Sequence, residues 1–315
     1  MKSVIVHICD KSWLGYSLVS SMSFAAVAAE QNIERKIFVG GISDADLGIA
    51  RDFADAHSPG VDILPFQMAD RAGFRVADFP TDRAVPVWAM GRLYLSLLLD
   101  KSWDRVLYLD GDTLAGPVPI DMGQDLQGKV FGAVEDFTYR NAYDSMFIRD
   151  GLRGRGHRYF NSGVLLIDWQ KWGGQTEEDA LEFYQKCVRF LKHNDQCALN
   201  HTCVGRWCPL DLSWNTGTSM LWKAEYAKKA RVVHFYGSTK PWDSGRFKEH
   251  GTWTKPYQDF QKIFPLEMAV SPRTLTHELR YALRRIRYLI QSKPEDLRHL
   301  RPYLQEHYPD YIARD

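Results

Sequence analysis

Short runs of β-branched and apolar residues alternate with longer helical segments along most of this chain. Strands are predicted at residues 4–9, 36–39, 61–64, 105–109, 129–134, 164–167 and 231–235. Helices are predicted at residues 14–29, 44–56, 86–99 and 177–191. This alternation is typical of an α/β domain with a mostly parallel central sheet flanked by helices, in which ligands bind beyond the carboxyl ends of the strands. Asp10, Asp110 and Asp136 each follow a predicted strand, so we expect the site at this edge.

The tripeptide Asp110-Gly111-Asp112 directly follows the apolar run at residues 105–109. Two carboxylates two residues apart at a strand end can face one divalent cation, and without a cation they repel each other. We expect Gly111 to omit a side chain that would crowd the metal. The alternative is a polar turn, because aspartate is a common turn former, and Asp-Gly-Asp alone favours neither reading.

The composition indicates an ordinary globular protein of 315 residues, 45% hydrophobic and 25% charged. A net charge of +1 gives no indication of a nucleic-acid partner. The five cysteines are odd in number and form no Cys-x-x-Cys pair, which favours reduced thiols over disulfides or a zinc site. No signal-peptide pattern precedes the first strand and no run of eighteen apolar residues occurs, so a cytoplasmic location is expected.

Four further motifs accompany Asp-Gly-Asp, at residues 88–93, 159–167, 194–200 and 234–242. Together with the strand at residues 4–10, their order and spacing resemble glycosyltransferase family 8. These retaining sugar-nucleotide transferases include bacterial lipopolysaccharide galactosyl- and glucosyltransferases and the glycogenins. The resemblance spans residues 3–242 and implies a GT-A fold, a Rossmann-like sheet flanked by helices, followed by a small C-terminal helical segment.

The resemblance implies a metal and phosphate site. Asp110, Asp112 and His234 would hold Mn²⁺, with Mg²⁺ as the other candidate, because carboxylate and imidazole donors suit an octahedral ion with positions open to phosphate oxygens. Lys240 would add a positive charge at the diphosphate, and Gly237 would let backbone amides approach it.

Other positions would bind the donor sugar nucleotide or act in catalysis, as the resemblance implies. Arg92 would reach the donor, Asp10 the uracil ring, and Asp136 and Asn161 the sugar hydroxyls; the alternative for each is a surface, turn or cap residue. Asp195 and Gln196 would lie beneath the anomeric carbon. Either Asp195 acts as a nucleophile on the far face, or Gln196 stabilises charge in a front-face transfer. Many family members have Asp where Cys197 stands, and we interpret Cys197 as a small semi-buried thiol.

Two expectations concern parts of the chain where the resemblance is weak. Residues 1–265 are predicted to form the catalytic domain and residues 266–315 a helical segment, with eight Lys/Arg against three Asp/Glu at residues 273–301. Its apolar positions share one helical face, which predicts either a peripheral anchor on anionic lipid or packing on the body or a second subunit; they are Leu275, Leu279, Leu283, Ile286 and Ile290. The arginine-rich stretch 137–158 is either a mobile loop over the site or a solvated surface loop.

We therefore predict a metal-dependent retaining transferase that moves a hexose, glucose or galactose, from a UDP-sugar to a glycan acceptor. The acceptor is expected to be lipopolysaccharide or lipooligosaccharide, and the enzyme to lie in the cytoplasm or peripherally on the inner membrane face. No nucleic-acid partner is expected. One alternative is a catalytically silent UDP-sugar-binding scaffold. Another is a haloacid-dehalogenase-like phosphatase, because residues 109–114 resemble its aspartate motif, although they are one residue too short.

Overall fold

The computed structural model describes most of the chain. Its described residues are 1–79, 87–136, 158–188, 191, 193–218, 220–221, 224–237, 240–243, 251–268, 274–276, 279, 282–283 and 286. The predicted loop at residues 137–158 lies outside this set except for Arg158, as does Ile290 of the C-terminal segment. The boundary predicted at residue 265 stays a prediction.

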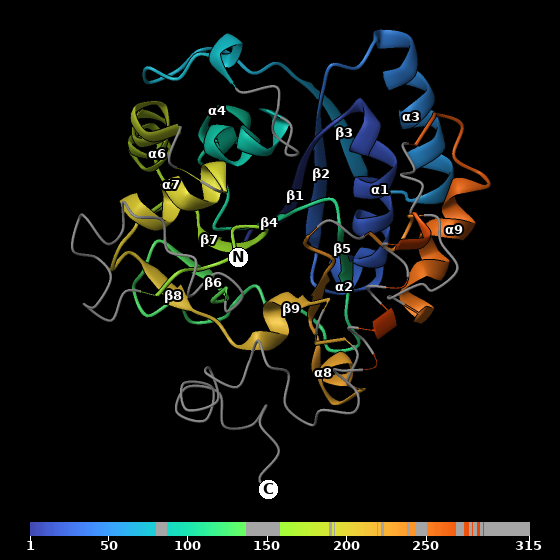
Figure 1. Cartoon of the computed structure of the whole chain (residues 1–315). Coiled ribbons are helices and arrows are strands. Elements are labelled where there is room, and N and C mark those ends of the chain that lie inside the picture. The colour runs from blue at the N-terminus through green and yellow to red at the C-terminus, as the bar shows by residue number, and fades with distance from the viewer. Residues whose placement is uncertain are drawn as a thin grey trace, which may run out of the picture.

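A seven-stranded sheet forms the centre of the molecule (Figure 1). In spatial order its strands are β3 (Val61–Phe66), β2 (Ile33–Gly40), β1 (Ser3–Asp10), β4 (Arg105–Leu109), β7 (Val164–Asp168), β6 (Phe131–Ala133) and β8 (Trp207–Pro209). Strands β3, β2, β1 and β4 run parallel, β7 runs antiparallel to β4 and β6, and β6 runs parallel to β8. The predicted α/β class with a mostly parallel sheet is confirmed.

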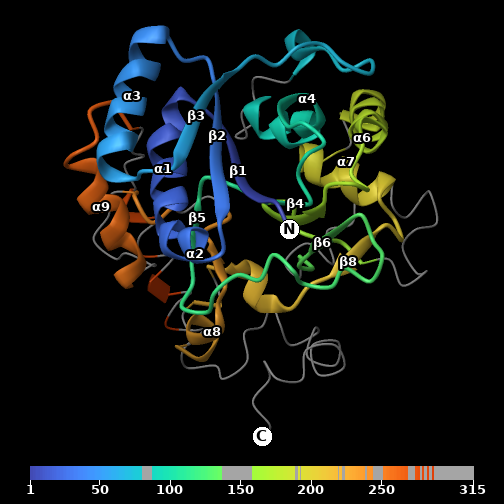
Figure 2. The ribbon, with the colours of Figure 1, turned by 180° about the vertical axis from the view of Figure 1, so that it is seen from behind.

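Helices cover both faces of this sheet, as Figures 1 and 2 show from opposite sides. One side carries α1 (Leu14–Ser23), α2 (Ala25–Glu30), α3 (Asp44–His57) and α9 (Lys255–Gln261). The other carries α4 (Leu95–Leu98), α6 (Gly174–Cys187) and α7 (Asn194–Thr202). The apolar run of β1 is buried on both faces, because Val4, Val6 and Ile8 pack toward α4, α6 and α7, and Ile5 packs on the opposite face.

A second, three-stranded sheet returns the chain to the end of β4. Its order is β5 (Thr113–Ala115), β10 (Val232–His234) and β9 (Thr216–Gly217), with α8 (Ala224–Lys229) between β9 and β10 in sequence. Strand β10 runs antiparallel to β5 and pairs His234 with Thr113. Since β5 begins directly after Asp112, this pairing brings His234 to the Asp-Gly-Asp turn.

The segment around Arg92 departs from the predicted helix at residues 86–99. A 3-10 helix spans Val87–Tyr94 and α4 follows it, so the prediction of one α-helix is wrong. Gly91 lies so close to β1 that a Cβ there would be 2.4 Å from Ile8 Cγ2. Five consecutive residues, 90–94, are buried, which does not fit an amphipathic α-helix packed by one face.

Smaller differences concern the ends of other elements. The helix predicted at residues 14–29 is divided at Phe24 into α1 and α2, and α6 begins and ends a few residues before the predicted helix at 177–191. Among the residues described, no helix is both long and apolar enough to cross a membrane.

Candidate active site

The Asp-Gly-Asp turn lies where the two sheets meet. Asp110 N–H donates to Gly163 O at 2.8 Å and so continues the pairing of β4 with β7. Two residues later, Asp112 O accepts from Phe235 N–H at 2.9 Å. The turn is therefore held on one side by the start of β7 and on the other by the residue after β10.

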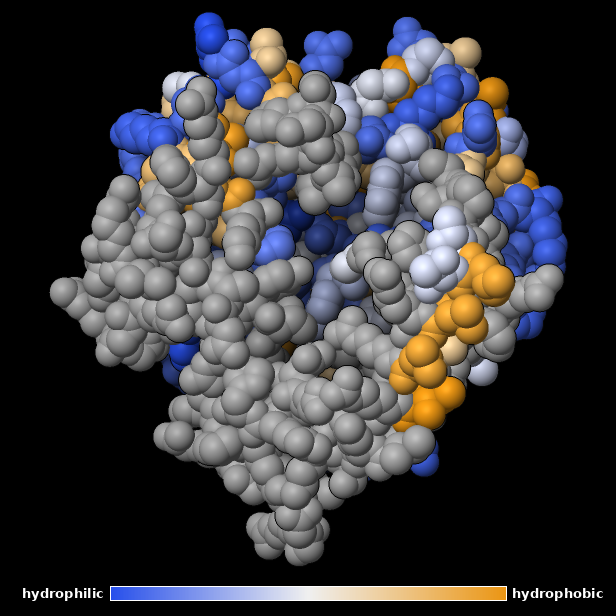
Figure 3. Space-filling view, viewed as in Figure 1, coloured by the Kyte–Doolittle hydropathy of each residue, from blue (hydrophilic) through white to orange (hydrophobic). Residues whose placement is uncertain are grey.

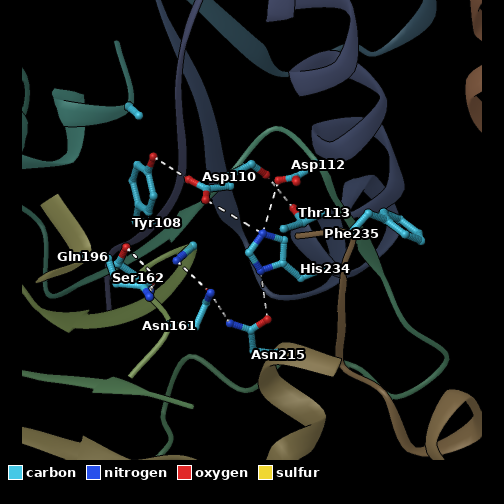
Figure 4. Close-up of polar contacts among 12 residues, drawn as sticks. Tyr108, Asp110, Asp112, Thr113, Asn161, Ser162, Gln196, Asn215, His234 and Phe235 are labelled. Carbon is cyan, nitrogen blue, oxygen red and sulfur yellow. Dashed lines mark hydrogen bonds and ion pairs between the residues drawn. The ribbon is translucent and has the colours of Figure 1, made fainter. Parts of the chain in front are cut away.

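Asp110, Asp112 and His234 come together at this turn (Figure 4). His234 Nε2 lies 3.8 Å from Asp110 Oδ2 and 3.3 Å from Asp112 Oδ1. One possible ligand atom from each of the three residues lies within 4.8 Å of the others. Two carboxylates and one imidazole leave coordination positions open, so these residues fit the Mn²⁺ or Mg²⁺ expected from the sequence.

The second oxygen of each carboxylate is already bound by the protein. Asp110 Oδ1 accepts hydrogen bonds from Arg92 Nη2 at 2.8 Å and Tyr108 Oη at 2.9 Å, and Asp112 Oδ2 accepts from Lys240 Nζ at 2.5 Å. Burial alone would raise the pKa of Asp112, but the Lys240 ammonium and the His234 ring hold this pKa well below its usual range. Asp112 is therefore a carboxylate, with Oδ1 turned toward His234.

Two glycines make room around the turn, for different neighbours. A Cβ on Gly163 would lie 2.2 Å from His234 Cε1 and 2.6 Å from Asp110 Oδ2, so only glycine allows these ligands to approach β7. A Cβ on Gly111 would meet Ser17 Oγ at 2.6 Å. The expectation that Gly111 keeps space free for the metal is therefore wrong, because it makes room for α1.

Arg92 is buried between carboxylates on two different elements. Its Nη2 pairs with Asp110, its Nε lies 3.0 Å from Asp195 Oδ2, and its Nη1 donates to Ser162 O at 2.5 Å. Burial opposes the charged form, yet Asp110 and Asp195 together raise the pKa of Arg92 above its ordinary value. The planar guanidinium therefore links the end of β4 to the first turn of α7.

Asp195 and Gln196 lie beside this link, on the first turn of α7. Burial raises the pKa of Asp195 to about 6, and the Arg92 guanidinium opposes that rise. Gln196 Oε1 accepts from Ser162 N–H at 3.0 Å, and its Nε2 donates to Tyr159 Oη at 3.2 Å. Tyr159 and Ser162, which precede β7 in the sequence, thus fix the orientation of the Gln196 amide.

Asp136 and Asn161 line a pocket beside Gln196. Asp136 Oδ2 accepts long hydrogen bonds from Asn161 Nδ2 at 3.5 Å and Gln196 Nε2 at 3.4 Å. The pocket has polar and apolar walls, and its lining residues are Val134, Glu135, Asp136, Asn161, Leu212, Asn215, Met220 and Tyr236. Figure 3 shows hydrophilic residues at the bottom of a central hollow on this side of the molecule.

Asp10 and Gly237 are the two predicted site residues that take no part in the side-chain contacts described above. Asp10 caps the short 3-10 helix after β1, where its Oδ1 accepts from Trp13 N–H at 3.0 Å. Trp13 in turn packs edge-on against Trp242, and Lys240 Nζ lies 5.6 Å from the Trp13 ring centre. Gly237 has a φ of +98°, a conformation that favours glycine.

A buried hydrogen-bond chain supports the turn from behind. Thr113 Oγ1 donates to Asp110 O at 2.9 Å, so it accepts at 2.7 Å from Ser20 Oγ, which accepts at 2.8 Å from His7 Nε2. Burial, and secondarily Arg35, lower the pKa of His7 to about 3. Within the described residues, His7 Nδ1 has no hydrogen-bond partner.

Sequence reasoning missed several residues of this site. Tyr108 could have been found, because the two-residue period of a strand places it on the same side of β4 as Asp110. Ser162 lies inside a recognised motif but was given no role. The sequence offers no comparable signal for His7 or Asn215.

Comparison with known proteins agrees with this geometry. The model of the family described as "Glycosyl transferase family 8" matches residues 4–245. The chain belongs to this family. Family 8 membership accounts for the occurrence of the five sequence motifs together in one GT-A fold.

Family relatives in bacteria match only part of the sequence. General stress protein A of Bacillus subtilis is 30% identical over 168 residues, which cover 47% of this chain and 56% of that protein. The lipopolysaccharide 1,2-glucosyltransferase of Escherichia coli is 29% identical over 172 residues, half of each chain. The chain thus spans about half the length of these curated relatives.

Solved structures share the fold. The galactosyltransferase LgtC, determined with donor and acceptor sugar analogues, superposes with a TM-score of 0.65 at 23% identity. This match covers 84% of the present chain and 97% of LgtC. It establishes the GT-A fold for this family member.

Proposed function

We propose that this glycosyltransferase is metal-dependent and retaining, and that it transfers a hexose, glucose or galactose, from a UDP-sugar to a glycan acceptor. The observation that carries the proposal is the convergence of Asp110 Oδ2, Asp112 Oδ1 and His234 Nε2 at the junction of the two sheets. These three atoms would bind Mn²⁺ or Mg²⁺, which when bound neutralises the diphosphate leaving group.

The protein's own residues would complete the donor site. Lys240 adds a positive charge beside Asp112, where a diphosphate would meet the cation. Gly237 lets the backbone approach the phosphates, and Asp10, beside Trp13, faces the nucleobase in the proposed arrangement. Arg92, paired with Asp110 and Asp195, would reach the donor.

Asp195 and Gln196 are the proposed catalytic residues, with Asp136 and Asn161 binding sugar hydroxyls. Asp195 as nucleophile would bond to the anomeric carbon as UDP leaves, and the acceptor oxygen would then break that bond. Gln196 in a front-face transfer would stabilise positive charge without a covalent bond. Mass spectrometry of an acceptor-free reaction separates the two, because only the first adds a hexose to the peptide that contains Asp195.

The acceptor proposal draws on the family relatives and on the C-terminal segment. A lipopolysaccharide or lipooligosaccharide acceptor would place the enzyme on the inner face of a membrane. An apolar strip lies at the lower right of the face shown in Figure 3. Among the described residues of the C-terminal segment, the exposed large apolar side chains are Leu275, Leu279, Leu283 and Ile286. Exposed apolar side chains in a segment whose sequence is rich in basic residues fit an anionic lipid surface. Truncation after Val270 should then weaken binding to anionic vesicles.

Calorimetric titration with UDP-glucose, UDP-galactose and UDP-N-acetylglucosamine, with and without Mn²⁺, tests the donor and the metal. We expect Mn²⁺-dependent binding of a hexose donor, and a loss of transfer on the order of 10³-fold in Asp112→Asn, because a bound metal supplies several kcal/mol of charge stabilisation. Asp62→Asn, on the exposed side of β3, is the matched control. Full activity of Asp112→Asn would refute the metal assignment, and binding without transfer or hydrolysis would favour the silent scaffold.

A further inference from the structure

Asn215 holds the third member of the candidate metal cluster. It ends the 3-10 helix Leu212–Asn215 and is buried. Its Oδ1 lies 3.0 Å from His234 Nδ1, the ring nitrogen opposite the two carboxylates (Figure 4). Its Nδ2 donates to Asn161 Oδ1 at 2.9 Å. Asp110 and Asp112 each have a protein partner on one oxygen, and Asn215 is the partner of His234 in the same way. The hydrogen-bonding atoms of Asn215 decide which nitrogen of the His234 ring carries the hydrogen.

A backbone group fixes the direction of every bond in this chain. Gly163 N–H can only donate, so the Asn161 atom that it contacts at 3.0 Å is the carbonyl oxygen Oδ1. That oxygen can only accept, so Asn215 turns Nδ2 toward it and presents Oδ1 to His234. Because Oδ1 also only accepts, His234 Nδ1 carries the hydrogen. Nε2 is left facing the two carboxylates.

We propose that Asn215 is a positioning residue that sets the tautomer and orientation of His234 for binding a divalent cation through Nε2. The inference rests on the proposed metal-dependent function. Ligating histidines commonly donate their other N–H to an outer partner, and loss of that partner typically costs about 10–100-fold in metal affinity. Here Asn215 donates to Asn161, and the same Asn161 oxygen accepts from Gly163 N–H. The Gly163 carbonyl in turn accepts from Asp110 N–H. Gly163, directly before β7, is therefore connected to two of the three candidate ligands, Asp110 and His234.

Three variants separate positioning from packing. Asn215→Leu keeps similar volume but removes both hydrogen bonds. Asn215→Asp keeps an oxygen that can accept from His234 Nδ1–H. Thr216→Val is the matched control, because Thr216 Oγ1 donates only to Leu212 O in the same segment and has no bond to His234. Thermal melts establish that each variant is folded.

Two readouts test the proposal without relying on activity. Long-range ¹H–¹⁵N correlation spectra of metal-free protein, recorded at a pH high enough for the His234 ring to be neutral, report which nitrogen carries the single hydrogen, with the His234 signals assigned by their loss in His234→Gln. Titration with Mn²⁺ in the presence of UDP, followed by electron paramagnetic resonance, reports affinity. We expect the Nδ1–H tautomer in wild type, Asn215→Asp and Thr216→Val, and a shift toward Nε2–H in Asn215→Leu, with Mn²⁺ bound about 10–100-fold more weakly.

The outcomes distinguish this inference from the function on which it rests. A neutral His234 ring with its hydrogen on Nε2 in the wild type, or wild-type Mn²⁺ affinity in Asn215→Leu, would overturn the role of Asn215. If wild type itself fails to bind Mn²⁺, the proposed metal dependence fails, and the spectra of wild type and Asn215→Leu still decide whether Asn215 sets the tautomer.

Discussion

Two buried histidines lie on opposite sides of the Asp-Gly-Asp turn and use their ring nitrogens in opposite ways. Behind the turn, His7 Nε2–H donates into a chain of hydroxyls that ends on Asp110 O. In front of it, His234 Nδ1–H donates to Asn215, and Nε2 faces carboxylate oxygens. Both rings are almost completely shielded from solvent.

The difference shows that burial alone does not distinguish a structural histidine from a candidate metal ligand. The polar groups around each ring do so. The region behind the turn, here called the rear network, consists of His7, Ser20 and Thr113 and has hydroxyl groups whose hydrogens are all committed. The region in front, the candidate metal cluster, consists of Asp110, Asp112 and His234, and each offers one possible ligand atom within 4.8 Å of the others. Damage to the cluster should therefore reduce activity most, and damage to the rear network should reduce stability most.

The largest expected effect comes from crowding the candidate metal cluster. Gly163→Ala places a Cβ within 2.2 Å of His234 Cε1 and 2.6 Å of Asp110 Oδ2, so one or both ligands must move. Because displacement of reacting groups by about 1 Å can cost 10²-fold, we expect kcat/KM to fall on the order of 100-fold. Gly173→Ala is the control, since a Cβ at Gly173 has no neighbour within 4 Å. Equal kinetics for the two variants would show that the cluster is not the reaction site.

The next effect concerns the rear network and pH. The folded-state pKa of His7 is lowered from 6.5 to about 3, so its contribution to stability is complete above pH 6.5 and is lost as the pH falls toward 3. The slope is at most about 1.4 kcal/mol per pH unit over that window. His7→Gln retains a donor for Ser20 but cannot take up the proton. Urea unfolding at several pH values should show a shallower decline below pH 6.5 in this variant, and identical slopes would contradict the assignment.

A smaller effect is expected where the rear network meets the turn. Thr113→Val removes the hydroxyl that donates to Asp110 O and accepts from Ser20. The loss should destabilise the protein by about 1–3 kcal/mol, because Ser20 and the carbonyl lose a buried partner. Thr202→Val offers a control on α7, where the hydroxyl donates to Ala198 O and is only partly buried. A loss no greater than that of Thr202→Val would mean that the rear network does not stabilise the turn.

The smallest effect is expected at Cys197, which lies on α7. Its Sγ lies 3.2 Å from Tyr159 Oη, and it follows Gln196 where many family members have aspartate. Cys197→Ser can keep this polar contact, so kcat should stay close to wild type, with stability changed by less than about 1.5 kcal/mol. A large loss of kcat with an unchanged melting temperature would show that the thiol takes part in the reaction.

Much of the fold could be predicted from local pattern. Six of the seven strands of the central sheet follow from apolar runs of the right length, whereas β8 was not predicted. Asp110 and Asp136 lie beyond strands as expected. The 3-10 helix at Val87–Tyr94 could not be predicted, because it depends on the close approach of Gly91 to Ile8, a contact between distant segments.

The candidate site divides in the same way. The Asp-Gly-Asp turn and the later motifs indicated residues that the structure brings together, although their roles stay predictions. Asn215 and His7 could not be found, because hydrogen-bond partners far apart in sequence obey no period. Gly111 was assigned to the wrong neighbour for a related reason: the sequence does not reveal that α1 packs against the turn.

The junction of β4 and β7 has an evolutionary consequence. The Asp-Gly-Asp turn follows the end of β4, and Gly163 directly precedes the antiparallel strand β7. The distance between them is therefore set by the β4–β7 pairing and not by the number of residues between β6 and Asn161. Sequence changes in length between β6 and Asn161 are therefore compatible with an unchanged candidate metal cluster, so long as Asn161 and the two residues after it keep their place before β7.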